Sequence, residues 1–382
     1  MARTIQTVRE LRERAQRRAG GDMPEAEFRS GFAALLAQAP AGTLRGHAFF
    51  FVPANMPPWF DTGLDCRAGD HLTVFAAGRT HLSRELDLWI NPHFQLWYRI
   101  GEKGEVFRGT RCSHTFTAPS SGRLFLAGYF PGEWATRSGD LAVPADVYSQ
   151  VEGGISVLVT RWAVDPLAGL KRLSQLGDVR ALLASEIDRL EDPISTPEGW
   201  EYPWFVGPSE TFAVVPQAHQ RHAIACYTHE DAALLQKNVP LPFTLDTRLR
   251  WSWKMDILPS RSREDELPTH DYLSLAVEFD NGQDLTYFWS AELPPETGFR
   301  CPIATWQGRE THVVVRSGQA GLGQWLPEER NLYADYVRWV GEPPARIVRV
   351  WLIALSLFRR QEGQCEYGAI ELLTGDHVTV VN

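Results

Sequence analysis

The stretch LRWSWKMD, residues 249–256, decides the fold class of this chain. Its apolar residues Leu249, Trp251, Trp253 and Met255 alternate with polar residues. A period of two places the four apolar side chains on one face of a β-strand. A strand with one aromatic face, followed by no recognisable catalytic motif, is typical of a β-sandwich with a recognition surface.

Length and charge narrow the class of protein further. The chain has 382 residues, which exceeds what a single hydrophobic core normally serves, so we expect two domains. Its net charge of −9 argues against a nucleic-acid groove, because phosphate binding depends on clustered Lys and Arg. We therefore expect no nucleic-acid partner.

The cysteines and the N-terminal residues indicate the compartment. Five widely spaced cysteines with no CxxC pair favour a reducing environment. Residues 1–21 contain six arginines and lack the apolar core of a secretory signal. The sequence also contains no run of eighteen apolar residues, so we expect no transmembrane segment and a cytoplasmic protein.

Pattern changes along the chain divide it into four parts. Short strands separated by turn residues begin near residue 46, and a helical period returns after residue 165 before several prolines interrupt it. The fold class that we predict is mainly β, with two β-sandwich domains. The predicted parts are a helical N-terminal segment (1–44), a first sandwich (45–164), a helical linker (165–198) and a second sandwich (199–382).

The first sandwich resembles the galactophilic bacterial lectins and their galactose-binding-like relatives. The similar segments are DTGL (61–64), AGDHLTVFAAG (68–78), YRIGEKG (98–104), GRLFL (122–126) and GGISV (153–157). The resemblance covers about residues 46–163 and implies a galactose-binding-like jelly roll.

The resemblance also implies a calcium ion, held late in the domain by acidic and Asn side chains, that bridges the protein to sugar hydroxyls. This chain has Gln150, Val151 and Glu152 where the lectins have paired Asn. Candidate replacement ligands for calcium are Asp140, Asp146 and Glu152, although such loop carboxylates are more often simply solvated. The aromatic residues Tyr129 and Trp134, at the start of the 130–152 loop, are candidate ligand-binding residues.

The second sandwich resembles the bacterial domain-of-unknown-function family 3047. The similar segments are LRWSWKM (249–255), VRSG (315–318) and ERNLYADYV (329–337) followed by GEPP (341–344). The resemblance spans about residues 200–373 and implies a jelly-roll fold without established chemistry. The chain departs from the family pattern at His270-Asp271 and Leu275, where acidic residues and an Arg are expected, so a polar centre of the family becomes more apolar.

Few residues invite a catalytic or metal-binding interpretation. The candidates for acid–base chemistry are His270, Asp271, Asp335 and Glu366, and the competing interpretation is that they are ordinary structural or exposed residues. Metal-capable side chains also occur close together in the sequence at His219, His222, Cys226 and His229. The predicted strand from His222 to Cys226, however, keeps His219 and His229 apart by most of its length.

Tryptophans near predicted loop ends suggest a binding face. Trp289, Trp306 and Trp325, together with Tyr287 and Arg316, are candidate ligand-binding residues, because indole faces stack on sugar rings while the N–H bonds to polar atoms. The competing interpretation is that large aromatic residues fill the core.

Three functions therefore remain open at this point. We favour a non-catalytic recognition protein that binds a saccharide, a glycoconjugate or another small molecule. The first alternative is an enzyme of secondary metabolism, of the cyclase or lyase type, that uses an apolar pocket with one or two acidic residues. The second is a structural scaffold, and a homo-oligomer is among the assemblies that the sequence leaves open.

Overall fold

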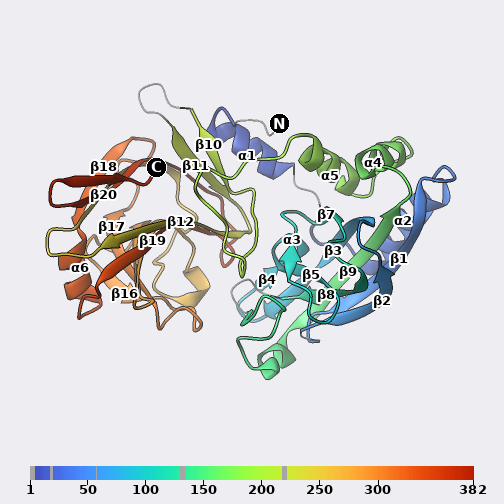
Figure 1. Ribbon diagram of the computed structural model, residues 1–382, viewed down its shortest axis with the longest axis horizontal. Coiled ribbons are helices and arrows are strands. Elements are labelled where there is room, and N and C mark those ends of the chain that lie inside the picture. The colour runs from blue at the N-terminus through green and yellow to red at the C-terminus, as the bar shows by residue number, and fades with distance from the viewer. Residues whose placement is uncertain (1–4, 18–19, 57, 130–133, 217–221) are drawn as a thin grey trace. The chain divides into compact units, whose positions relative to one another are not determined.

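A computed structural model of the protein describes residues 5–17, 20–56, 58–129, 134–216 and 222–382 (Figure 1). It consists of two compact units. The N-terminal sandwich comprises Arg17–Pro193 and Trp204–Ser209, and the C-terminal sandwich comprises Met1–Gln16, Ile194–Pro203 and Glu210–Asn382. Both are built mainly from antiparallel sheets, which confirms the predicted fold class. Among the described helices, none is long and apolar enough to cross a membrane.

The described residues of the N-terminal sandwich form nine strands in two sheets. Their bounds are β1 (Leu44–Pro53), β2 (Phe60–Cys66), β3 (His71–Ser83), β4 (Leu88–Ile90), β5 (Leu96–Ile100), β6 (Phe107–Arg108), β7 (Ser113–Thr117), β8 (Gly122–Gly128) and β9 (Glu152–Trp162). One sheet has the order β1-β9-β3-β4 with β7 also paired to β3, and the other has the order β2-β8-β5-β6. Val74 and Val157 of the first sheet pack with Leu124 and Leu126 of the second, so the core lies between the sheets.

Helices cover the outer face of the sheet that contains β3 and β9. They are α2 (Glu25–Ala37), α4 (Pro166–Ser174) and α5 (Leu182–Glu191), and two shorter helices are α3 (Pro92–Gln95) and the 3-10 helix η1 (Ala145–Gln150). Phe32 of α2, Leu170 of α4 and Leu182 of α5 pack in one buried cluster with Phe75 and Trp162 of the sheet. The predicted linker helices thus serve as one layer of the N-terminal sandwich.

The C-terminal sandwich contains the remaining strands and two α-helices. The bounds are α1 (Val8–Gln16), β10 (Phe212–Val215), β11 (Ala223–Thr228), β12 (Ala232–Pro242), β13 (Arg248–Ile257), the 3-10 helix η2 (Leu267–Thr269), β14 (Tyr272–Phe279), β15 (Asp284–Ser290), β16 (Gly298–Arg300), β17 (Glu310–Ser317), β18 (Leu326–Asn331), α6 (Leu332–Trp339), β19 (Arg346–Leu355), β20 (Gly363–Thr374) and β21 (His377–Val380). One sheet has the order β10-β11-β20-β13-β18 with β21 paired to β20. The other has the order β12-β19-β14-β15-β17-β16.

Strand β13 behaves as its sequence predicts. Leu249, Trp251, Trp253 and Met255 are each at most 1% exposed and lie in the core between the two sheets, whereas the alternate residues are exposed or half-buried. The interior of a sandwich accepts apolar side chains from both sheets, so the period of two is retained along this strand.

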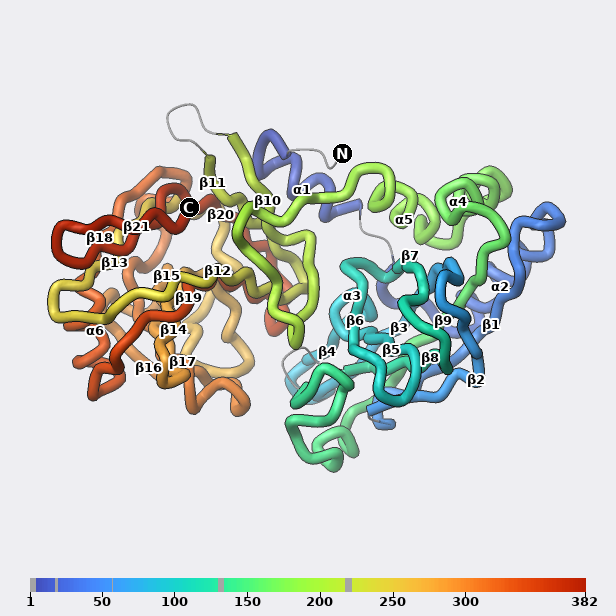
Figure 2. The backbone as a smooth tube through the Cα atoms, in the orientation of Figure 1, coloured from blue at the N-terminus to red at the C-terminus, as the bar shows by residue number. Residues whose placement is uncertain are grey.

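The outer face of the same sheet is only partly covered. Helix α1 packs on β10 and β11, where Val8 and Leu11 lie in a buried cluster with Ala213 and Tyr227. Figure 2 shows this early segment, in blue, lying against strands from later parts of the chain. The outer faces of β13 and β18 keep exposed and half-buried polar residues instead.

The opposite sheet is buried on both faces at its centre. Every residue of β14 and β15 is buried, although their outward-facing positions include polar residues such as Tyr272, Thr286 and Asp284. The segments around Glu264 and Cys301 make contacts on this outer side. These segments bury polar side chains against the outer face of the sheet and so form a second buried region, which is polar.

Candidate functional site

A group of polar side chains lies on the uncovered outer face of β13 and β20. Lys254 Nζ lies 3.0 Å from Glu366 Oε1 and 3.4 Å from Asp256 Oδ1, and Gln364 Nε2 donates to Asp256 Oδ2 at 3.0 Å. Burial opposes the charge of Lys254, but its contacts with Glu366 and Asp256 outweigh burial and raise its pKa. All four residues are half-buried, so the group offers hydrogen-bond donors and acceptors at the surface.

Trp325 adds an aromatic ring to this outer face. The next residue, Leu326, pairs with Trp253 on β13, so the same register places Trp325 opposite Lys254. Because Trp253 points into the core, its alternating neighbour Lys254 and the residue opposite, Trp325, point outward. Trp325 is 37% exposed, so part of its ring is accessible at the surface on this side of the sheet.

The loop that carries Trp325 is held by a hydrogen bond to β13 and by an ion pair between the strands β17 and β18 at its two ends. Gly323 N donates to the carbonyl oxygen of Met255 on β13 at 2.7 Å. Gly323 has a φ of 76°, in the left-handed region that glycine adopts without steric cost. Arg316, just before the loop, forms an ion pair with Glu328, just after it. These contacts limit the positions that the Trp325 ring can take.

The other aromatic residues predicted beside Trp325 lie mainly in the core. Trp289 is 2% exposed, and its Nε1 donates to Gly318 O at 2.8 Å in the loop before Trp325. The guanidinium of Arg316 lies 5.7 Å from the centre of the Trp289 ring. Tyr287 is fully buried. Trp289 and Arg316 thus support the loop, whereas Trp325 is the ring that a ligand can reach.

Three further predicted ligand-binding residues have other surroundings. Trp306 is half-buried under the guanidinium of Arg309, which lies 4.7 Å from its ring centre. Tyr129 and Trp134 are at most 4% exposed and stack on each other with ring centres 4.2 Å apart. Trp134 also stacks on Trp59 at 5.0 Å. The two rings of the N-terminal sandwich are core residues, and residues 130–133 of the predicted loop lie outside the described residues.

Two of the candidate acid–base residues have structural partners. Asp335 accepts a hydrogen bond from Tyr287 Oη at 2.8 Å and two from Arg330, each at 2.8 Å. This pairing joins α6 to β15 and β18. Glu366 pairs with Lys254 on the outer face described above, where it can accept hydrogen bonds from a ligand.

Asp271 holds a backbone turn in place. It is fully buried and accepts hydrogen bonds from the backbone N–H groups of Phe358 at 3.0 Å and Arg359 at 2.6 Å. Burial raises its pKa to about 6 in spite of these bonds. Its neighbour His270 points into a different environment, the polar interior on the outer side of β14 and β17.

The residues predicted to replace the calcium ligands of the lectins make separate local contacts. Asp140 accepts a hydrogen bond from Thr136 Oγ1 at 2.7 Å, and Glu152 forms an ion pair with Arg84. Asp146 is exposed in η1. Within the described ranges, no group of three converging metal-capable side chains includes any of these residues.

His270, Cys301 and His312 do converge. One ligand atom of each lies within 4.8 Å of the others, and all three residues are fully buried. Cys301 Sγ lies 3.4 Å from His270 Nε2. Glu310, two residues before His312 on β17, has its Oε1 3.5 Å from His312 Nε2 and accepts a hydrogen bond from Tyr272 Oη at 3.1 Å.

Sequence reasoning noticed only one member of this cluster. His270, Cys301 and the β17 residues Glu310 and His312 come from three separate parts of the chain that the tertiary fold brings together. The feature of the sequence that could have indicated the cluster is the spacing of Glu310 and His312, since residues two apart on a strand share a face. The metal-capable group proposed around His222 differs, because Cys226 lies in the core, His222 is exposed and His219 lies outside the described residues.

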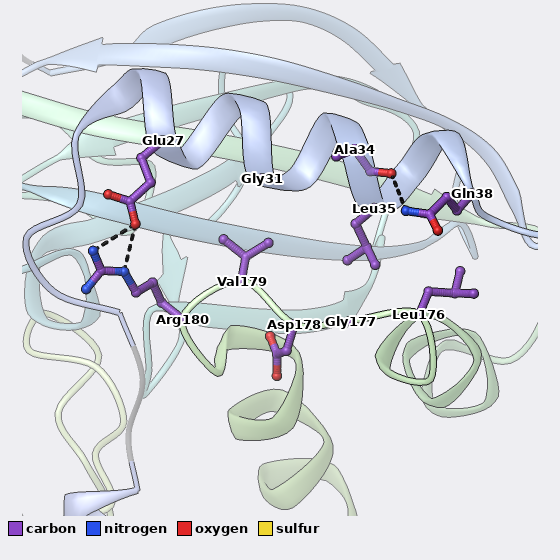
Figure 3. Close-up of a pocket in the computed structure, with 10 residues that line it drawn as sticks. All are labelled: Glu27, Gly31, Ala34, Leu35, Gln38, Leu176, Gly177, Asp178, Val179 and Arg180. Carbon is purple, nitrogen blue, oxygen red and sulfur yellow. Dashed lines mark hydrogen bonds and ion pairs between the residues drawn. The ribbon is translucent and has the colours of Figure 1, made fainter.

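A cavity of about 350 Å³ lies on the N-terminal sandwich, between α2 and the segment joining α4 to α5 (Figure 3). Its charged lining residues already have protein partners. Arg180 Nη2 lies 2.7 Å from Glu27 Oε1, and the carboxylate of Asp178 accepts hydrogen bonds from the backbone N–H groups of Leu183 and Ala184 at 2.9 Å. The charged groups that line the cavity therefore stabilise the neighbouring helices α2 and α5.

Most of the C-terminal sandwich matches a known protein family. Residues 198–371 match the family described as a protein of unknown function, DUF3047. The resemblance predicted for the C-terminal half is thus confirmed. A comparison with curated protein sequences gave no match.

Solved structures with some similarity to this chain include a lectin domain, a carbohydrate-binding module and a xyloglucanase domain. The PllA-like lectin domain at the N-terminus of EclA is 21% identical, with a TM-score of 0.24 over 32% of this chain and 99% of that chain. TmCBM61, in complex with β-1,4-galactotriose, is 11% identical, with a TM-score of 0.23 over 46% and 88%. The xyloglucanase domain of NopAA from Sinorhizobium fredii, in complex with cellobiose, is 6% identical, with a TM-score of 0.30 over 49% and 94%. At these values the likeness identifies neither a ligand nor a reaction for this chain.

Proposed function

We propose that this protein is a non-catalytic recognition protein that binds a carbohydrate or glycoconjugate through the outer face of β13, β18 and β20. The observation that carries the proposal is the position of Trp325, which is 37% exposed on the same face as Lys254, Asp256 and Glu366. A saccharide ring presents an apolar face that stacks on an indole and hydroxyl groups at its rim that need donors and acceptors. The proposed face offers both kinds of contact side by side.

The surroundings of Trp325 suit recognition because they are preorganised. Its loop is held by Gly323 and by the ion pair of Arg316 with Glu328, so little conformational freedom remains to be lost on binding. The polar groups of Lys254 and Glu366 already contact each other at 3.0 Å. Sugar hydroxyls can bond to the free lone pairs and N–H groups of this pair without separating it.

The test is binding of the purified full-length protein to an array of defined oligosaccharides, followed by calorimetric titration of the strongest one. Replacing Trp325 by Ala removes the stacking surface, and we expect an affinity loss of about tenfold, since stacking on an aromatic ring is worth about 1–1.5 kcal/mol. The matched control is Leu245→Ala, because Leu245 is 74% exposed and lies in the same sandwich outside this face.

Two results would contradict the proposal. The first is the absence of binding to any oligosaccharide on the array at millimolar concentration. The second is an unchanged affinity of Trp325→Ala when its circular dichroism and melting temperature match those of the parent protein. A similar loss in Leu245→Ala would also remove the assignment to this face.

A further inference from the structure

A buried polar cluster in the C-terminal sandwich has the side chains of a metal centre. His270, Cys301, Glu310 and His312 supply two imidazoles, a thiol and a carboxylate. Their residues are between 0 and 2% exposed. Cys, His and Glu are the residue types that bind zinc in proteins, and four protein ligands are typical of its closed, structural sites. The cluster lies outside the face proposed for carbohydrate binding.

The distances between ligand atoms suit tetrahedral coordination. Zinc bonds of about 2.3 Å to sulfur and 2.0–2.1 Å to nitrogen or oxygen place tetrahedral ligand atoms about 3.4–3.5 Å apart. Cys301 Sγ and His270 Nε2 lie 3.4 Å apart, and His312 Nε2 and Glu310 Oε1 lie 3.5 Å apart. The ligand atoms of the two histidines and the cysteine all lie within 4.8 Å of one another, so the three surround a common position.

His312 gives an independent indication of a missing ligand. It is fully buried, and neither of its ring nitrogens has a hydrogen-bond partner among the residues that the structure describes. Buried polar atoms are normally hydrogen-bonded, since leaving one unpaired is unfavourable. The ring of Phe299 stacks on His312 with centres 5.0 Å apart and limits access of water from that side. A metal ion bound to Nε2 would satisfy this nitrogen.

The neighbours of the ligands hold them in the required orientation. His270 Nδ1–H donates a hydrogen bond to the carbonyl oxygen of Glu264 at 2.5 Å, which leaves the lone pair of Nε2 on the side of Cys301. Glu310 Oε1 accepts hydrogen bonds from Tyr272 Oη at 3.1 Å and from Thr286 Oγ1 at 3.2 Å. Such outer contacts fix the tautomer of a ligating imidazole and the position of a ligating carboxylate.

The charges of the ligands also match a divalent cation. Cysteine binds a metal ion as a thiolate, so the Cys301 thiol gives up its proton when an ion binds. Binding of a divalent ion releases this proton to solvent and leaves a thiolate. The thiolate of Cys301 and the carboxylate of Glu310 then carry two negative charges against two positive charges, and the buried site is neutral.

We propose that His270, Cys301, Glu310 and His312 form a four-coordinate Zn²⁺ site that fastens the segments around His270 and Cys301 to β17. The role is structural, since all four positions of a tetrahedral ion are taken by protein and none is left for a substrate.

Metal analysis and cobalt substitution test the site. The full-length protein, purified without chelator, is expected to contain about one zinc ion per chain or to bind one when it is supplied. After chelation, Co²⁺ should restore about one ion per chain, with the intense visible bands of four-coordinate cobalt and a thiolate-to-cobalt charge-transfer band, and Zn²⁺ should remove both.

Two variants separate this site from other thiols. Cys301→Ala should lose the charge-transfer band, whereas Cys365→Ala should keep it, because Cys365 is also buried in this sandwich but lies opposite Cys226 on the paired strands β11 and β20, outside the group of His270, Cys301 and His312. If Cys301→Ala does not fold, Glu310→Gln serves instead. It retains the sulfur ligand and should keep the charge-transfer band while binding cobalt at least tenfold more weakly, since the anionic oxygen ligand is lost.

The proposal is overturned if the parent protein neither contains nor takes up a stoichiometric metal ion. It is equally overturned if Cys301→Ala folds and retains the charge-transfer band, or if Cys365→Ala loses it. Oligosaccharide binding by the outer face is measured separately and decides nothing about this site.

Discussion

The ring of His114 makes the stability of the N-terminal sandwich sensitive to acid. His114 lies on β7 beside Tyr98 and Phe116, and the centre of its ring is 5.7 Å from that of Tyr98 and 5.6 Å from that of Phe116. The residue is half-buried, but Nδ1 is buried without a hydrogen-bond partner among the described residues. Burial, followed by the positive charge of Arg189, lowers its pKa to about 4, and Glu186 opposes this only in part. The folded state therefore favours the neutral ring.

The size and direction of the effect follow from proton linkage. The unfolded chain binds a proton on this histidine at a pKa of 6.5, whereas the folded state binds it near 4. Stability attributable to His114 is therefore complete above pH 6.5 and is lost as the pH falls toward 4. Between pH 7.5 and pH 5 this pKa difference corresponds to about 2 kcal/mol, and partial exposure of the ring reduces it, so we expect a loss of about 1–2 kcal/mol.

Replacing His114 by Phe tests this reasoning, because it keeps an aromatic ring in contact with Tyr98 and Phe116 and removes the titrating group. Denaturant unfolding at pH 7.5, 6.5, 5.5 and 5 gives the free energy of unfolding of both proteins. Since other histidines titrate in this range, the informative quantity is the difference between the two pH profiles. His71→Phe is the control, because His71 is exposed on the adjacent strand β3.

We expect His114→Phe to lose about 1–2 kcal/mol less than the parent protein between pH 7.5 and pH 5. His71→Phe should follow the parent profile. Parallel profiles for the parent and His114→Phe would refute the reasoning, as would a steeper decline in the variant.

Two further substitutions probe packing in the C-terminal sandwich. Leu11→Ala should lower the free energy of unfolding of this sandwich by about 2–5 kcal/mol, because Leu11 is fully buried where α1 packs on β11. A denaturation midpoint equal to that of the parent protein would contradict this packing of α1. Tyr287→Phe should lower the free energy of unfolding by about 1 kcal/mol through loss of the hydrogen bond to Asp335, while oligosaccharide affinity stays unchanged. A large affinity change in Tyr287→Phe would show that Tyr287 belongs to the binding face.

The fold class could be predicted because it depends on local patterns. The alternation in β13 is visible in any eight-residue window, and the core accepts Trp251 and Trp253 as the pattern requires. In β14 and β15 burial does not alternate with a period of two, since other parts of the chain pack on both faces of these strands and bury every residue. No local pattern records which strand is covered twice, because the cover comes from distant parts of the chain.

The choice among aromatic residues shows the same limit. Trp289 and Trp325 look alike in sequence, each close to a loop end. In the structure Trp289 is 2% exposed and supports the loop, whereas Trp325 is 37% exposed on the outer face. Exposure depends on the register of β18 against β13, which a sequence of this length does not reveal by itself.

The sequence by itself determined that this chain forms β-sandwiches with aromatic cores, because strand periodicity reports which face of each strand avoids water. Only the tertiary structure decided where chemistry can occur. His270, Cys301 and His312 come together because β17, the segment before β14 and the segment after β16 meet on one side of a sheet. Contacts between residues far apart in the sequence are fixed by strand pairing and packing, and these act on the whole chain at once.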